Sequence, residues 1–154
     1  MNVHVKVEIW SDVVCPWCYV GKRRFESAMA AFPQPVEVTY RSFELDPGAP
    51  TGSGHRTVDW LAQRYGGPER VAAMQAHVRD LGLAEGLDLR LDETFYVKTI
   101  DAHRLLHLAL ETGGPAAQSS LNEALMAANF TAVLDLSDHA VDNSPSTFVS
   151  EEAA

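Results

Sequence analysis

The chain has 154 residues, 46% of them hydrophobic, and a formal net charge of −9. This length and composition indicate about one soluble globular domain with a core of its own, not a disordered chain. The negative charge argues against a broad nucleic-acid interface, and no apolar run has the length of a membrane span. The first residues lack the basic and apolar pattern of a secretory signal, so we expect a cytoplasmic protein.

Residues 3–10 and 36–43 are predicted to form two strands on either side of a helix. In both segments aliphatic or aromatic residues alternate with mostly polar ones, a period of two that gives a strand one apolar face. Between them, apolar residues at helical spacing predict a helix from Pro16 to Ala31, which ends before Pro33. The three elements together predict a β-α-β unit.

The only two cysteines, Cys15 and Cys18, lie three positions apart where the first strand leads into this helix. Unpaired N–H groups and the helix dipole favour a thiolate at Cys15, and Pro16 suits the first helical position because it has no N–H to leave unpaired. Cys18, about one turn further on, should be more covered. We expect a redox-active pair in which Cys15 attacks and Cys18 resolves.

Other uses of this Cys-x-x-Cys motif fit less well. Structural zinc usually takes four protein ligands, and here there is no second such motif and the histidines are scattered. A structural disulfide closing so short a loop would restrict the unfolded chain little. His103 and His107 stand one helical turn apart, but no H-E-x-x-H motif or third ligand accompanies them, so we interpret them as ordinary helix-face residues. No metal site is predicted.

Residues next to the cysteines are candidates for tuning the dithiol. Asp12 either shuttles protons or only ends the strand, and the sequence leaves both open. The indole of Trp17 cannot place a charge beside a thiolate, so we expect a Cys15 pKa below that of a free thiol but above the extreme of about 3.5. The basic run 22–24 either raises the local potential or is a solvated helical face. We adopt the solvated face, because exposed charges usually contribute little.

The rest of the chain is predicted to be mainly helical. A loop rich in Pro, Gly and Ser at 44–56 leads into a separate helical region. Capping, glycine and stripe patterns there predict helices at 57–65, 68–86, 100–112 and 116–130. The aromatic residues of this region are candidates for a substrate groove, but aromatics at helical spacing are more often core, and we adopt that interpretation for Trp60, Tyr65, Phe95 and Tyr96.

The segment from Ile9 to Lys22, which contains Cys-Pro-Trp-Cys, resembles the active-site segment of FrnE-like proteins in the DsbA family. These proteins are thioredoxin-fold disulfide oxidoreductases. Residues 41–45 also resemble the end of the family's second strand, and residues 101–106 resemble a helix of its inserted helical domain. The resemblance covers roughly residues 3–136.

This resemblance implies an α/β protein with a thioredoxin-like β-α-β fold and an inserted α-helical domain. Residues 1–45 would form the β-α-β half, 57–131 the insertion and 132–154 an atypical tail. The implied activity is thiol–disulfide exchange on protein or small-molecule thiols through Cys15 and Cys18. No cofactor is implied beyond the redox-active disulfide, with glutathione a candidate co-substrate.

The last residues depart from the family pattern. In the family a helix, a β-hairpin and a closing helix follow the insertion, and a cis-proline at the start of the hairpin faces the dithiol. Residues 132–154 are too few for these elements, and Pro145 is a weak candidate for that proline. We therefore expect the C-terminal β-β-α part to be missing and the open sheet edge to favour self-association.

Two further functions remain open at this stage. A glutathione-dependent isomerase of the 2-hydroxychromene-2-carboxylate type shares the fold, but those relatives typically carry serine where Cys15 stands and have no dithiol. An inactive fragment that serves as a binding module is the other alternative. The presence of both cysteines favours the oxidoreductase.

Overall fold

Two strands and four helices form the part of the chain that the computed structural model describes, residues 4–52 and 54–139. In chain order they are β1 (Val5–Ser11), α1 (Pro16–Ala31), β2 (Val36–Ser42), α2 (Thr57–Tyr65), α3 (Pro68–Ala84) and α4 (Ile100–Phe130). The α/β class and the predicted β-α-β unit are confirmed. Residues 87–91, which follow α3, contain no helix or strand.

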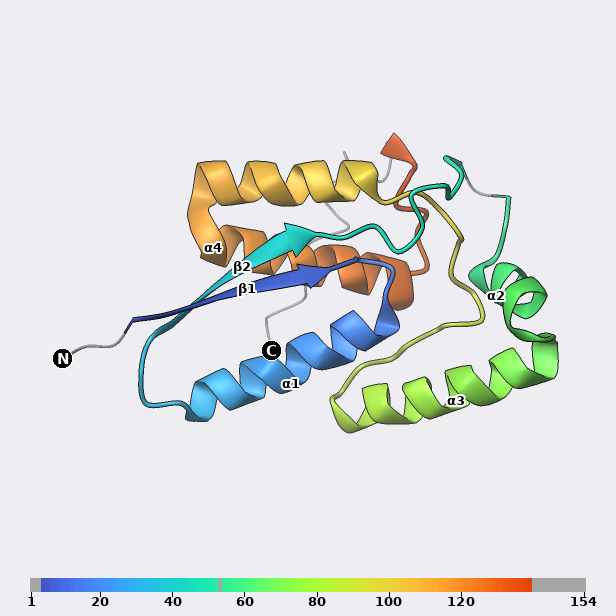
Figure 1. Ribbon diagram of the computed structural model, residues 1–154, viewed down its shortest axis with the longest axis horizontal. Helices are drawn as coiled ribbons and strands as arrows, with labels where there is room; N and C mark the ends of the chain where they lie inside the picture. The colour runs from blue at the N-terminus through green and yellow to red at the C-terminus, as the bar shows by residue number, and fades with distance from the viewer. Residues whose placement is uncertain (1–3, 53, 140–154) are drawn as a thin grey trace, which may run out of the picture.

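The strands β1 and β2 are parallel, with Val5 opposite Val36 and Ser11 opposite Ser42. Parallel neighbours need a crossover connection, and α1 supplies it. Along β1, half-buried residues alternate with exposed ones until the buried Ser11, as the period of two predicts. Figure 1 shows the two strands lying between α1 and the first half of α4.

Helix α4 consists of two helical halves that meet at Gly114. This residue has φ 78° and ψ −174°, and Pro115 follows it. A positive φ suits glycine, which has no Cβ, and proline has no N–H with which to continue the preceding helix. The two halves run in opposite directions (Figure 1), so the predicted break at the Gly113–Gly114 pair is confirmed.

One hydrophobic core joins both of the predicted regions. Its residues come from the β1–α1 corner, α1, α3, the segment after α3, both halves of α4 and the segment after α4. They include Val13, Val20, Val78, Leu89, Leu106, Leu125 and Leu136. The ring of Tyr19 stacks on that of Phe130, with centroids 6.0 Å apart. The predicted division of the chain at residues 46–56 is therefore not a division of the core.

A side chain of α4 occupies the edge of β2 that faces away from β1. The Tyr40 N–H donates to Gln118 Oε1 at 2.8 Å, and Gln118 Nε2 donates to the Tyr40 carbonyl at 3.0 Å. Gln118 is fully buried, so its amide satisfies backbone groups that a further strand would otherwise pair. Within the described residues, no strand pairs with the other edge of β1. Self-association through that edge remains a prediction, which light scattering would test.

The basic run on α1 is solvated only in part, because Arg24 is exposed whereas Lys22 is buried. Lys22 is only 5% exposed, and its Nζ donates to Glu123 Oε2 of α4 at 2.8 Å and also to Glu26. Arg23 pairs with the same Glu123. The interpretation as solvated charge is therefore wrong for Lys22, because a carboxylate from a distant helix covers it. These acidic partners also offset the positive charge near the start of α1.

Candidate active site

The two cysteines lie at the N-terminal end of α1. Cys15 is the N-cap residue, and its Sγ accepts a hydrogen bond from the Cys18 N–H at 3.4 Å. Pro16 fills the first helical position, where a missing N–H breaks no bond. Both cysteines are free thiols. Local capping rules thus place Cys15 Sγ at the positive end of the helix dipole.

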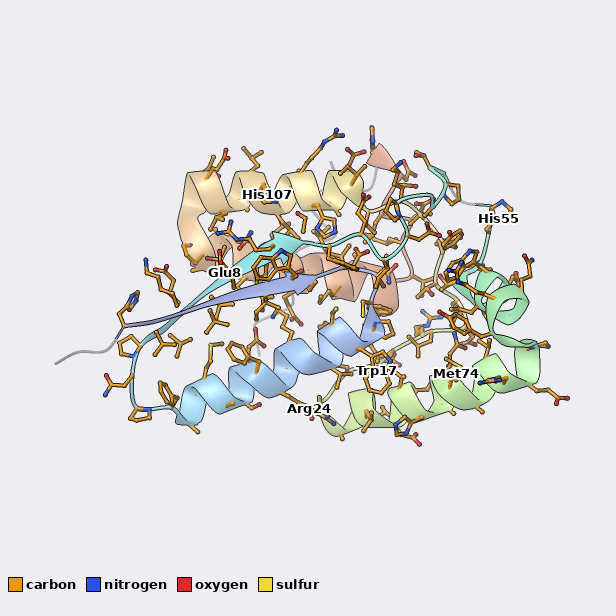
Figure 2. All side chains as sticks on the ribbon, viewed as in Figure 1. Glu8, Trp17, Arg24, His55, Met74 and His107 are labelled. Atoms are coloured by element: carbon orange, nitrogen blue, oxygen red, sulfur yellow. The ribbon has the colours of Figure 1, made fainter. Side chains whose placement is uncertain are left out.

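A cavity of about 390 Å³ opens beside Cys15. Cys15, Pro16 and Trp17 contribute to its lining, whereas Cys18 does not and packs against the hydrophobic core. Trp17 is 53% exposed and lies against His77 of α3, with ring centroids 6.0 Å apart (Figure 2 labels Trp17 at the start of α1). Cys15 is therefore the thiol that a substrate in the cavity would meet.

Aromatic and apolar side chains from several elements line this cavity. They include Trp60 and Tyr65 of α2, Met74 of α3, the neighbours Phe95 and Tyr96, and Phe130 of α4. Trp60 and Tyr96 stack with centroids 4.6 Å apart. The interpretation of the four sequence-selected aromatics as ordinary core is therefore wrong, since they face a space shared with Cys15. Helical periodicity could not show this, because it does not tell which segments meet.

The two thiols influence each other through a hydrogen bond between their side chains. This bond lowers the pKa of Cys18 to about 7 and raises the pKa of Cys15, which burial raises further. The backbone N–H groups of Cys18 and Trp17 act in the opposite direction on Cys15. The pair therefore loses its first proton more readily than a free thiol does. The prediction of a lowered pKa at Cys15 is therefore wrong for the reduced protein, because the hydrogen bond with the second thiol lowers the pKa of Cys18 instead.

Asp12 and His103 form a buried pair close to the dithiol. They are 2% and 3% exposed, and His103 Nε2 lies 3.2 Å from Asp12 Oδ1. Asp12 Oδ2 accepts from the Leu45 N–H at 2.9 Å, and the Asp12 carbonyl accepts from the Cys15 N–H at 3.1 Å. Asp12 therefore does more than end a strand. The interpretation of His103 as an ordinary helix-face residue is wrong, because its side chain is buried and contacts Asp12. The spacing between His103 and His107 could not indicate this contact.

His107 Nε2 lies 2.8 Å from Ser42 Oγ, and among residues 4–52 and 54–139 no group of three His, Cys, Asp or Glu side chains could hold a metal ion. No helix in the described part of the chain is long and apolar enough to cross a membrane. Pro145, the candidate for the cis-proline, lies outside the described residues.

Alkylation of the dithiol should depend on pH with a midpoint well below that of a free thiol. Since the first proton leaves with a pKa of about 7, the reaction with iodoacetamide should be slow below that pH and fast above it. Although the pKa of about 7 belongs to Cys18, the hydrogen bond lets the two thiols share the remaining proton. We therefore expect Cys15 to take the first label, because it is the thiol that lines the cavity. Labelling rates at a series of pH values, with peptide mass mapping, would measure both. Equal labelling of both cysteines at an ordinary thiol midpoint would contradict this prediction.

A β-α-β unit with a Cys-x-x-Cys motif at the start of its helix defines a thioredoxin-like domain. The profile of the DSBA-like thioredoxin domain matches residues 6–143, so the chain belongs to that family. The family and the thioredoxin-like fold expected from the active-site segment are thereby confirmed.

The individual proteins similar to this chain include one solved structure and one sequence relative. The crystal structure of a probable DsbA oxidoreductase from Streptomyces coelicolor matches with a TM-score of 0.75 and 45% sequence identity, over 82% of this chain and 54% of that one. The uncharacterized protein YwbO of Bacillus subtilis (strain 168) is 51% identical over 47 residues, which are 30% of this chain and 22% of YwbO. The chain thus spans about half the length of the solved structure that it matches.

Proposed function

We propose that this chain is a FrnE-like thiol–disulfide oxidoreductase that works through Cys15 and Cys18. The observation that carries the proposal is the unequal placement of the two thiols, with Cys15 on the cavity at the start of α1 and Cys18 against the core. The name of the Streptomyces coelicolor neighbour supports the same activity. We place the activity in the cytoplasm, with no bound cofactor and no nucleic-acid or membrane partner.

The reaction needs only the two cysteines and a substrate disulfide. The Cys15 thiolate attacks one substrate sulfur, and the other substrate sulfur leaves as a thiolate that takes up a proton. Cys18 then loses its proton and attacks Cys15 Sγ. The bond between Cys15 and the substrate breaks, the second substrate thiol leaves, and the Cys15–Cys18 disulfide forms. The same steps in reverse oxidise a substrate dithiol.

The walls of the cavity suggest which substrates would react well. Its lining is mainly aromatic and aliphatic, so a disulfide flanked by apolar groups would bury those groups beside Cys15. Protein disulfides with neighbouring apolar residues and small apolar disulfides both meet this description. Glutathione would then serve as the co-substrate that returns the pair to the dithiol form.

Three neighbours would tune the reaction. Pro16 fixes the helix start that presents N–H groups to Cys15, and Trp17 lines the cavity without adding charge. The Asp12 carbonyl accepts a hydrogen bond from the Cys15 N–H, and the charge of the Asp12 carboxylate acts on Cys18. The glutathione-dependent isomerase has no specific observation in its favour here.

Insulin reduction by dithiothreitol provides a direct test of the proposed activity. The purified chain should accelerate the precipitation of reduced insulin over the rate with dithiothreitol alone, because the dithiol relays electrons to the insulin disulfides. Prior alkylation of the cysteines should remove the acceleration. An alkylated sample as active as the untreated one would rule out the proposed function.

A further inference from the structure

We propose that His103 is a positioning residue that holds the Asp12 carboxylate beside the dithiol, so that Asp12 accepts the Cys18 proton during resolution of the mixed disulfide. This inference rests on the proposed function and assigns a role to a buried histidine that the exchange steps above leave unused.

The Asp12 carboxylate is held at both of its oxygens. Oδ1 lies 3.2 Å from His103 Nε2, and Oδ2 accepts from the Leu45 N–H at 2.9 Å. Because a carboxylate only accepts, Nε2 must carry the proton of the first contact. A carboxylate 2% exposed and without partners would be costly, so these two contacts fix its orientation as well as its burial.

His103 is itself held by the start of α4. It is 3% exposed, and its backbone N–H donates to the Thr99 carbonyl at 3.0 Å in the first turn of the helix. Helix α4 therefore brings a fixed imidazole to the end of β1, from a distant part of the chain.

Asp12 also acts directly on Cys18. The pKa of Cys18 is set first by the Cys15 thiol, but the backbone N–H of Asp12 lowers it further while the charge of the Asp12 carboxylate raises it. The geometry agrees with this closeness, since the Asp12 carbonyl accepts from the Cys15 N–H at 3.1 Å and Asp12 and Cys15 line the same cavity. The titratable groups around Asp12 include His103 from α4 and both cysteines at the start of α1.

This arrangement gives the resolving step a place for its proton. In the mixed disulfide Cys15 is bonded to the substrate sulfur and can no longer share a proton with Cys18. The Cys18 S–H transfers its proton to Asp12, and the Cys18 thiolate attacks Cys15 Sγ. The substrate sulfur leaves as a thiolate and takes a proton from Asp12 or water. Without His103, the carboxylate would lose the contact that aims it.

The reaction of the reduced protein with dithiobis(nitrobenzoate) separates the two steps. Attack by Cys15 releases one coloured nitrothiobenzoate, and resolution by Cys18 releases a second. In His103→Phe we expect the second release to be about 10- to 100-fold slower, as a misplaced reacting group implies. His103→Gln should stay close to the wild type, because its amide N–H still donates to Asp12.

His107→Phe is the matched control, since His107 lies one turn further along α4 and contacts Ser42 instead of Asp12. Its second release should match that of the wild type. Asp12→Asn should slow the second release as much as His103→Phe, and the double variant should be no slower than either single one, because the two residues act as a unit. The pH profile of the second release should change in both single variants.

The two releases test the proposed function and the role of His103 separately. Loss of the first release from the folded wild type would overturn the proposed function. A normal first release with an unchanged second release in His103→Phe, His103→Gln and Asp12→Asn would overturn the inference alone. If His103→Phe fails to fold by circular dichroism, Asp12→Asn decides, and a wild-type rate and pH profile in that variant would contradict the inference.

Discussion

Replacing Cys15 by serine should abolish disulfide exchange, whereas replacing Cys18 by serine should trap a covalent complex between the protein and its substrate. Cys15 lines the cavity and forms the first bond, so nothing can start without it. In the Cys18→Ser variant the first bond still forms, but no second thiol resolves it. Insulin turnover would measure the first effect, which should be a loss to the background rate. Intact mass spectrometry would detect the trapped adduct.

A covalent complex that forms with the Cys15→Ser variant instead would contradict the assignment of Cys15 as the attacking thiol. The pKa of about 7 falls on Cys18, so a purely ionisation-controlled reaction would start there. Trapping in Cys15→Ser, with no adduct in Cys18→Ser, would show that ionisation outweighs access to the cavity. The double serine variant is the matched control and should give neither turnover nor adduct.

Replacing Phe130 by alanine should lower the free energy of unfolding by about 3–5 kcal/mol. Phe130 is the last residue of α4, is 2% exposed and stacks on Tyr19 of α1. Its ring therefore connects the predicted helical insertion with the predicted β-α-β half. Truncation would leave a void that the surrounding helices fill only in part. Urea unfolding followed by circular dichroism would give the change in free energy.

Phe43→Ala is the control for that substitution. Phe43 is the same residue type but is 53% exposed, so its loss should change the free energy of unfolding by less than about 1 kcal/mol. Equal effects at the two positions would mean that the core does not depend on the contact between α1 and α4.

Local signals in the sequence predicted the elements of this fold well. Alternation of apolar residues gave β1 and β2, Pro16 and Pro68 mark helix starts, and the glycines near 113 mark the turn within α4. Each of these depends on backbone preferences over a few neighbouring residues. The same local rules placed Cys15 at the N-terminus of α1.

Contacts between distant segments could not be predicted in this way. The burial of Lys22 depends on Glu123, which lies 101 positions further along the chain. The cavity walls need α2, α3 and the residues near 95 to meet at Cys15, and the His103 contact needs α4 to meet the end of β1. Residue spacing within one helix does not indicate which distant segments come into contact.

The reduction potential of the Cys15–Cys18 pair tests the central claim most directly. The purified protein would be equilibrated with glutathione buffers of graded ratio, and the fraction of disulfide read from the mass after alkylation. We expect a single two-electron transition between about −120 and −270 mV, the span of thioredoxin-like exchange proteins. Two cysteines that never form an internal disulfide, or a disulfide more reducing than about −300 mV as in structural bonds, would contradict the account.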